Sequence, residues 1–186
     1  MMRFAALALL QTTRLTLRPS MPADAADFRA LERDPEVMRY LNGGHPVDQE
    51  EADPDAPFLM PRGTEPHVWT ARLAAGEAFV GWFCLWPEDD GLAELGYRLA
   101  RAFWGRGLAS EGAAALIAWG FTAAGYGRIV STTMVVNQGS RRVMEKIGMT
   151  HTRTVPFTSG DPIPGSEQGD VWYELTRAAW QAGRGH

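Results

Sequence analysis

Two glycines around an arginine, in the middle of the chain, have the composition of an anion-binding turn. The segment 103–111, FWGRGLASE, follows a strand-like run at 92–100 and opens a helix-like run at 108–124. A turn at a helix N-terminus leaves backbone N–H groups free, and such groups bind phosphate. Gly105 and Gly107 allow left-handed conformations and close approach of a ligand, and the arginine between them adds positive charge. A tight turn without a ligand also satisfies this pattern.

Composition limits the remaining possibilities. The chain has 186 residues, of which 45% are hydrophobic, enough for one substantial core. Its net charge of −4 gives no indication of nucleic-acid binding. The single cysteine, Cys84, lies in an apolar run and is interpreted as a small buried residue, so no disulfide within the chain is expected. The four histidines show no metal-ligand spacing, and no metal is predicted.

The N-terminus has a weak likeness to a signal peptide. Residues 4–10 are apolar and follow Arg3, but no small-residue cleavage site comes after them, and a period-2 strand begins at Arg14. Residues 1–13 are therefore interpreted as an extension of a cytoplasmic protein. No run approaches transmembrane length, and no membrane association is predicted. We expect one domain over 14–176, followed by a C-terminal tail at 177–186.

Hydrophobic periodicity and turn residues predict a mixed α/β domain. The expected order is strand, two helices, three antiparallel strands, helix, strand, helix and two strands. Strands are predicted at 14–19, 67–73, 78–86, 92–100, 128–136, 149–157 and 170–176, with Pro87 to Gly91 as a break between two of them. Helices are predicted at 22–33, 35–41, 108–124 and 137–147. The segment 45–66 is rich in Pro, Asp and Glu and is too long for an ordinary connection.

Three motifs together resemble the GNAT acetyltransferase superfamily. These are the turn WGRGLA at 104–109, the run NQGSRRVMEKIGM at 137–149 and the opening TRLTLR at 13–18. The chain is most similar to the branch that includes the bacterial ribosomal-protein N-terminal acetyltransferases. The likeness spans roughly 14–175 and leaves 45–66 outside it. It implies a single α/β domain whose mixed, mostly antiparallel, twisted sheet has about seven strands, flanking helices and a splayed central cleft.

The resemblance implies acetyl-CoA as co-substrate and no metal. The pyrophosphate is expected on the turn, and the pantetheine arm along the preceding strand in the manner of an added strand. The residues expected to bind acetyl-CoA are Tyr97, Arg98, Leu99, Trp104, Gly105, Arg106, Gly107, Leu108, Ala109, Ser110, Asn137 and Arg142. Trp104 departs from the arginine or glutamine of the family motif. Asn137 is also a good helix cap, while Arg142 and Lys146 are either phosphate ligands or solvated surface charges.

The resemblance also implies a base for the acceptor amine and an acid for the leaving thiolate. Glu94 is the candidate base, because partial burial on the strand beside the thioester would raise its pKa; otherwise it faces solvent. The family's tyrosine acid is replaced by Met144, which carries no proton. Ser140 is the candidate substitute, either as the acid or as a group that orients the sulfur while water donates the proton; otherwise it is a helix-surface serine.

The predicted activity is acetyl-CoA-dependent N-acetylation of a primary amine by direct transfer. A covalent acetyl-enzyme is not expected, because Cys84 lies on a buried-looking strand. The acceptor is a protein N-terminus or, alternatively, a small amine or antibiotic; a non-catalytic acyl-CoA-binding module is the other alternative. The segment 45–66 either attracts the amine or is solvated, and Trp82 and Trp86 share a strand face that could line an acceptor pocket. The protein is expected to be a monomer or homodimer.

Overall fold

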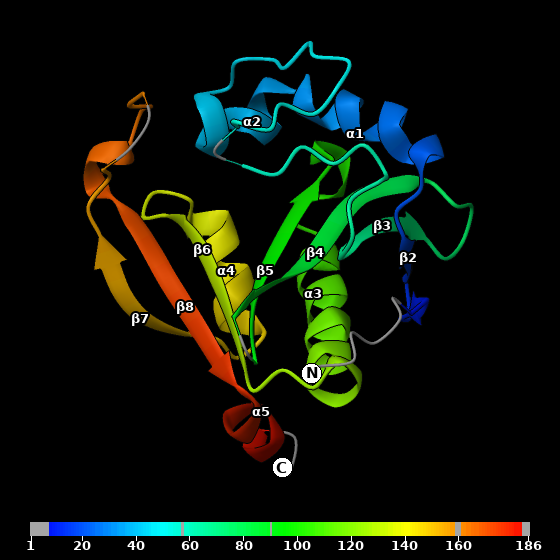
Figure 1. Ribbon diagram of the computed structural model, residues 1–186, viewed down its shortest axis with the longest axis vertical. Coiled ribbons are helices and arrows are strands. Elements are labelled where there is room, and N and C mark those ends of the chain that lie inside the picture. The colour runs from blue at the N-terminus through cyan, green and yellow to red at the C-terminus, as the bar shows by residue number, and fades with distance from the viewer. Residues whose placement is uncertain (1–7, 57, 90, 159–160, 184–186) are drawn as a thin grey trace.

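The computed structural model describes residues 8–56, 58–89, 91–158 and 161–183, and their strands form one sheet of eight in the order β1-β2-β3-β4-β5-β6-β8-β7 (Figure 1). All neighbours in this sheet are antiparallel except β5 and β6. The strands are β1 (Leu10–Gln11), β2 (Leu15–Pro19), β3 (Val68–Leu73), β4 (Phe79–Asp89), β5 (Leu92–Leu99), β6 (Arg128–Met134), β7 (Thr150–Val155) and β8 (Asp170–Thr176). The helices are α1 (Ala25–Glu32), α2 (Pro35–Asn42), α3 (Leu108–Trp119), α4 (Gln138–Lys146) and α5 (Arg177–Gly183).

The order of elements predicted from the sequence is confirmed, with three local corrections. The two-residue strand β1 lies in the predicted N-terminal extension and is too short to show a periodic pattern, but it pairs with β2. The predicted break at Pro87 is wrong, because β4 continues to Asp89 through a register shift that accommodates the proline. The predicted C-terminal tail contains α5, whose Trp180 ring lies 5.4 Å from the ring of Phe121. The part of the N-terminus at residues 1–7 lies outside the described residues.

The two faces of the sheet are covered by different helices. On one face α3 and α4 bury the larger core, which contains Leu95 and Leu99 of β5 together with Leu116 and Met144. On the other face α1 buries a smaller core in which Phe28 packs with Trp82 and Cys84 of β4. Figure 1 shows α1 and α2 across the top of the sheet. No helix among the described residues is long and apolar enough to cross a membrane.

The sheet opens between its two parallel strands. β5 pairs with β6 only at Leu92, Ala93 and Glu94, whereas it pairs with β4 as far as Leu99. β6 continues to Met134 and pairs with β8 along its whole length. From Leu95 onward, therefore, the two strands diverge, as Figure 1 shows above their paired ends. The predicted splay of the central strands is confirmed.

Candidate active site

The turn between β5 and α3 has the backbone that its glycines predict. Gly105 and Gly107 have φ values of 69° and 77°, in the left-handed region that glycine adopts without strain, and Gly107 is the N-cap of α3. A glycine cap leaves no side chain over the first N–H groups of the helix. Leu108 is buried beneath the turn, so only its backbone faces outward. Arg106 lies with its guanidinium 5.5 Å from the ring of Phe103 and is exposed.

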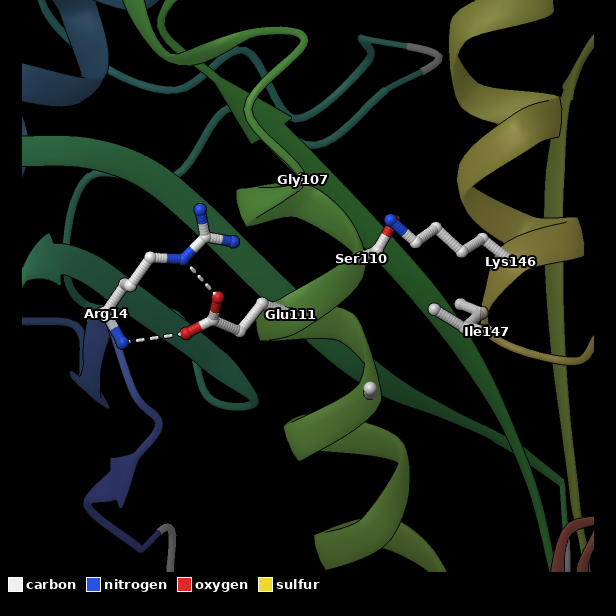
Figure 2. Close-up of a pocket in the computed structure, with 7 residues that line it drawn as sticks. Arg14, Gly107, Ser110, Glu111, Lys146 and Ile147 are labelled. Carbon is white, nitrogen blue, oxygen red and sulfur yellow. Dashed lines mark hydrogen bonds and ion pairs between the residues drawn. The ribbon is translucent and has the colours of Figure 1, made fainter.

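Two cations converge on this turn. A Cβ placed on Gly107 would lie 3.5 Å from Arg14 Nη2 and 3.9 Å from Lys146 Nζ. Figure 2 shows these residues around a cavity of about 310 Å³ between the start of β2, α3 and the end of α4. The cavity is lined by Arg14, Gly107, Ser110, Glu111, Ala114, Lys146 and Ile147. A left-handed glycine turn, a helix N-terminus and two converging cations form a site that fits a phosphate or diphosphate.

The predicted turn residues lie together, with different exposures. Ser110 lines the cavity and Ala109 packs against the larger core. The Trp104 side chain is 45% exposed, and its Nε1 donates a hydrogen bond to the Leu99 carbonyl at 2.7 Å. This bond fixes the turn to the end of β5, a role different from that of a donor to the ligand. Arg142 is exposed on α4 and does not line the cavity, whereas Lys146, one turn later, does.

The open side of β5 presents backbone groups. The N–H of Ala100 pairs with β4, and the carbonyls of Leu95 and Leu99 accept bonds from Ser131 Oγ and Trp104 Nε1. Because pairing alternates along an antiparallel strand, the N–H and carbonyl of Tyr97 point away from β4, into the splay. An extended amide chain can pair with that edge.

Arg98 lies away from the other predicted cofactor residues. Its side chain is buried on the α1 face, where Nη2 donates to the Leu59 carbonyl at 3.0 Å. Its guanidinium lies 5.0 Å from the Trp82 ring, and burial lowers its pKa to about 10. Leu99 is buried in the larger core, so it offers only its backbone, which already binds Trp104.

Glu94 lies where β5 and β6 separate. It is the last residue of β5 that pairs with β6, and its Oε1 accepts a hydrogen bond from Thr132 Oγ1 at 2.9 Å. Burial raises the pKa of Glu94, although the bond from Thr132 partly opposes the shift. A carboxylate with a raised pKa, at the fork of the splay, has the properties of a general base near neutral pH.

Ser140 contacts the splay from the α4 side. Its Oγ lies 2.9 Å from Tyr97 Oη, and its N–H donates to the side chain of Asn137, which caps α4 as predicted. Asn137 Nδ2 donates to Thr133 Oγ1 at 3.0 Å. Burial raises the pKa of the Tyr97 hydroxyl to about 12, so it stays protonated. Ser140 and Glu94 therefore approach β5 from opposite faces of the sheet.

Two residues without catalytic assignments are buried, as the sequence predicts for Cys84. Cys84 is buried, and burial raises the pKa of its thiol to about 12, which makes it a poor nucleophile. Met144 is buried in the larger core at the position where the family's tyrosine is expected. Neither side chain supplies a proton or a nucleophile to the splay.

The α1 face of β4 and β5 forms a second half of the site. Trp86 is the cross-strand partner of Glu94, and its ring lies 5.9 Å from that of His67, edge to face. Trp82, four residues earlier on the same face, is the partner of Arg98 and is buried. Of the two tryptophans, Trp86 is the partly exposed one. It lies beside Glu94, and its exposed surface is available to contact a ligand.

Ion pairs hold the acidic segment 45–66 against this half. Arg62 binds the buried carboxylate of Glu32 at 2.9 Å, and Met60 of the same segment is buried. Several of its acids have structural partners: Asp48 pairs with Arg33, Glu50 with Arg29, and Glu65 accepts bonds from the backbone of residues 62–64. The described residues of the segment thus form a wall whose charge is partly neutralised.

The sequence did not indicate two of the contributors to the site. Arg14 lies at the start of the first strand, 93 positions before Gly107, and no local pattern connects the two. The sequence predicts that Thr132 lies on a strand, but its contact with Glu94 depends on the register between β5 and β6. The one signal for Arg14 in the sequence is its place in the segment TRLTLR at 13–18, which resembles the opening of the family's sequences.

Comparison with known proteins agrees with this geometry. A family model described as "Acetyltransferase (GNAT) domain" matches residues 14–150. The chain is 35% identical over 182 residues to an "FsC-acetyl coenzyme A-N(2)-transacetylase" of Aspergillus fumigatus, covering 92% of this chain and 77% of that one.

Solved structures show the same fold. A GNAT-family acetyltransferase from Bacillus anthracis superposes with a TM-score of 0.76 at 24% identity, over 92% of this chain and 99% of that one. RimL, a ribosomal L7/L12 α-N-protein acetyltransferase in complex with CoA, superposes with a TM-score of 0.70 at 18% identity, over 91% and 98% of the two chains.

Fold and site together define an acyltransferase with a split-sheet binding cleft. The chain belongs to the GNAT acetyltransferase family and is an N-acetyltransferase. Family membership and the names of the relatives support the predicted enzyme over the non-catalytic binding module.

Proposed function

We propose that this enzyme transfers the acetyl group of acetyl-CoA directly to a primary amine, with Glu94 as general base. The observation that carries the proposal is the position of Glu94, a partly buried carboxylate with a raised pKa at the fork between β5 and β6. The phosphate-binding turn opens from the other end of β5. One strand therefore connects the site for the cofactor's phosphates to the candidate base.

The residues present fit acetyl-CoA along its length. Gly107, Arg14 and Lys146 suit the diphosphate, and the free backbone edge at Tyr97 suits the amides of the pantetheine arm. When bound, acetyl-CoA supplies an activated thioester. The protein's part is to hold the arm in the splay, which orients the thioester relative to Glu94.

Glu94 accepts the proton of the acceptor ammonium group. Because burial raises its pKa, the carboxylate is a stronger base than an exposed glutamate, while Thr132 holds one of its oxygens in place. Loss of that proton gives the amine its nucleophilic lone pair. On the other side of the splay, Ser140 donates a hydrogen bond to the leaving sulfur, and Tyr97 orients the Ser140 hydroxyl. A water molecule supplies the proton if Ser140 only orients the sulfur.

The acceptor approaches from the α1 face. Trp86 lies opposite Glu94 on that face, and the segment 45–66 forms a wall against it. The relative whose printed name includes N(2)-transacetylase, at 35% identity, supports a nitrogen atom as the acceptor, which a small-molecule amine would supply. The fold shared with RimL supports a protein N-terminus as the other candidate, at lower identity.

Product analysis with a mixed acceptor pool tests the proposal. The protein is incubated with acetyl-CoA and a pool of polyamines, amino-acid derivatives and N-terminal peptides, and CoA release and products are followed by a thiol assay and mass spectrometry. We expect a +42 Da product on one class of amine, the mass of an added acetyl group. Initial rates with both substrates varied should give intersecting lines, the pattern of a ternary complex. Parallel lines or an acetylated Cys84 would contradict direct transfer.

A further inference from the structure

Glu111 is a carboxylate beside a site built for phosphates. It lies in the first turn of α3, one residue after Ser110, and lines the same cavity as Arg14 and Lys146. Its charge is favourable for the helix dipole but repels an anionic ligand. If the cavity binds phosphate, Glu111 must make a favourable contribution to the site that outweighs its repulsion of the ligand.

Both oxygens of Glu111 are used in binding the N-terminal segment. Oε1 accepts hydrogen bonds from Thr12 Oγ1 at 2.6 Å and from the Arg14 backbone N–H at 2.8 Å. Oε2 accepts a bond from Arg14 Nε at 2.7 Å (Figure 2). These three bonds join the start of β2 to α3 across 97 positions of sequence or more.

The same bonds determine where the Arg14 guanidinium points. Nε is held by Glu111, and Nη1 donates to the carbonyl of Arg106 at 2.8 Å, inside the anion-binding turn. The guanidinium is planar and rigid, so fixing two of its nitrogens fixes the third. The third nitrogen, Nη2, is the one that lies 3.5 Å from a Cβ position on Gly107.

We propose that Glu111 is a positioning residue for acetyl-CoA, which holds Arg14 so that Nη1 fixes the turn and Nη2 faces the phosphates of the cofactor. This inference rests on the proposed function, because it takes the ligand of the turn to be the diphosphate of CoA. Arg14 contacts the cofactor in this arrangement, and Glu111 acts through Arg14.

Charge and positioning give opposite expectations for the removal of Glu111. If Glu111 acted only through its charge, its neutralisation would remove a repulsion and tighten the binding of anionic CoA. If it positions Arg14, the Glu111→Gln variant loses charge-assisted bonds to Arg14 and binds CoA about tenfold more weakly. The sign of the change in affinity therefore separates the two interpretations.

The test compares Glu111→Gln, Arg14→Gln, the double variant and Glu167→Gln, an exposed control with the same change in charge. Calorimetry measures the Kd of CoA, and initial rates give kcat and KM for acetyl-CoA and for S-acetylpantetheine, which lacks the phosphates. We expect Glu111→Gln to raise the Kd of CoA about tenfold with kcat and the KM for S-acetylpantetheine unchanged. The double variant should bind CoA no more weakly than Arg14→Gln, and the control should match the wild type.

Unchanged or tighter binding of CoA by Glu111→Gln, or an effect that adds to that of Arg14→Gln, would overturn the inference. If Glu111→Gln does not fold, Glu111→Asp decides, because it keeps the charge and shortens the reach: weaker CoA binding supports positioning and wild-type binding contradicts it. A wild-type protein that binds no CoA would instead refute the proposed function, so the two failures are distinguishable.

Discussion

The two halves of this site are stabilised by different kinds of interaction. The cofactor half, formed by the β5–α3 turn with α3 and α4, depends mainly on left-handed glycines and helix termini within short stretches of chain, with one ion pair between distant residues, that of Arg14 with Glu111. The acceptor half, formed by α1, α2, segment 45–66 and the facing sides of β4 and β5, is held by ion pairs between distant residues. Glu32 with Arg62 is its buried example.

This difference shows how one fold can keep its cofactor and vary its acceptor. Backbone N–H groups bind phosphate without requiring a particular side chain at each position, so we expect the cofactor half to tolerate a departure such as Trp104. In the proposed acceptor half, recognition would depend on side chains of a wall that ion pairs hold in place. Changes in the two halves should therefore have separable effects on the two substrates.

The largest expected effect is on the cofactor half. Gly107→Glu places a β-carbon at a left-handed φ and a negative charge between Arg14 and Lys146. We expect CoA affinity to fall by about 100-fold or more, because the charge repels phosphate and occupies the two cations. Calorimetry measures the affinity, and circular dichroism checks the fold. Gly107→Ala is the control for backbone strain without charge; a folded Gly107→Glu with undiminished affinity would place the phosphates elsewhere.

Replacing the candidate base should affect turnover and leave cofactor binding intact. We expect Glu94→Gln to lower kcat by about two to four orders of magnitude with the Kd of CoA nearly unchanged. Since burial raises the pKa of Glu94, and the ionised form is the active one, wild-type kcat/KM should fall as pH drops through a midpoint above the ordinary glutamate value. The pH–rate profile measures this midpoint. Glu167→Gln, at an exposed glutamate, is the charge-matched control, and wild-type turnover in Glu94→Gln at every pH would assign Glu94 a structural role.

The ion pair of Asp24, which lies directly before α1, should make the stability of the fold sensitive to acid. Burial raises the pKa of Asp24, but hydrogen bonds from Arg18, Thr70 and the Met21 N–H outweigh it and lower the pKa to about 2. Because the unfolded state binds this proton more readily, stability conferred by Asp24 is present above about pH 4 and lost as pH falls toward 2. We expect Asp24→Asn to cost about 3 kcal/mol of unfolding free energy at pH 7. Urea titrations from pH 7 to 3 should show a shallower pH dependence in the variant, and parallel curves would contradict the pairing.

Removing the hydroxyls on the α4 side should have a moderate effect. We expect Ser140→Ala to lower kcat about tenfold, because water replaces a weak acid, and Tyr97→Phe to lower it less. If Tyr97 acts by orienting Ser140, Tyr97→Phe should have no further effect in the Ser140→Ala background. Rates of CoA release measure these changes, and additive losses would show that the two hydroxyls act separately.

The smallest expected effect is that of acidic charge on segment 45–66. Amide substitution of Glu50, Glu51, Asp53 and Asp55 should raise the acceptor KM about two- to fivefold at low salt and leave the KM for acetyl-CoA unchanged. The change should vanish at high ionic strength, where charges are screened over about 3–8 Å. Rates at two salt concentrations measure it. An unchanged acceptor KM at low salt would leave the segment a wall without electrostatic steering.

The sequence by itself determined most of the elements and the backbone of the cofactor half. The left-handed backbone at Gly105 and Gly107, the Asn137 cap and the burial of Cys84 all follow from local chemistry, because turn and cap preferences act over a few residues. Glu94 was singled out by its residue type and its strand.

Only the tertiary structure decided which distant side chains complete the site. Arg14 reaches Gly107 because β2 and α3 meet through Glu111, and Arg98 lies under segment 45–66 because alternate residues of β5 face opposite sides of the sheet. Strand register brings Thr132 to Glu94, and helix packing brings Ser140 to Tyr97. Such contacts depend on the packing of the whole chain, and a local pattern of residue types does not encode it.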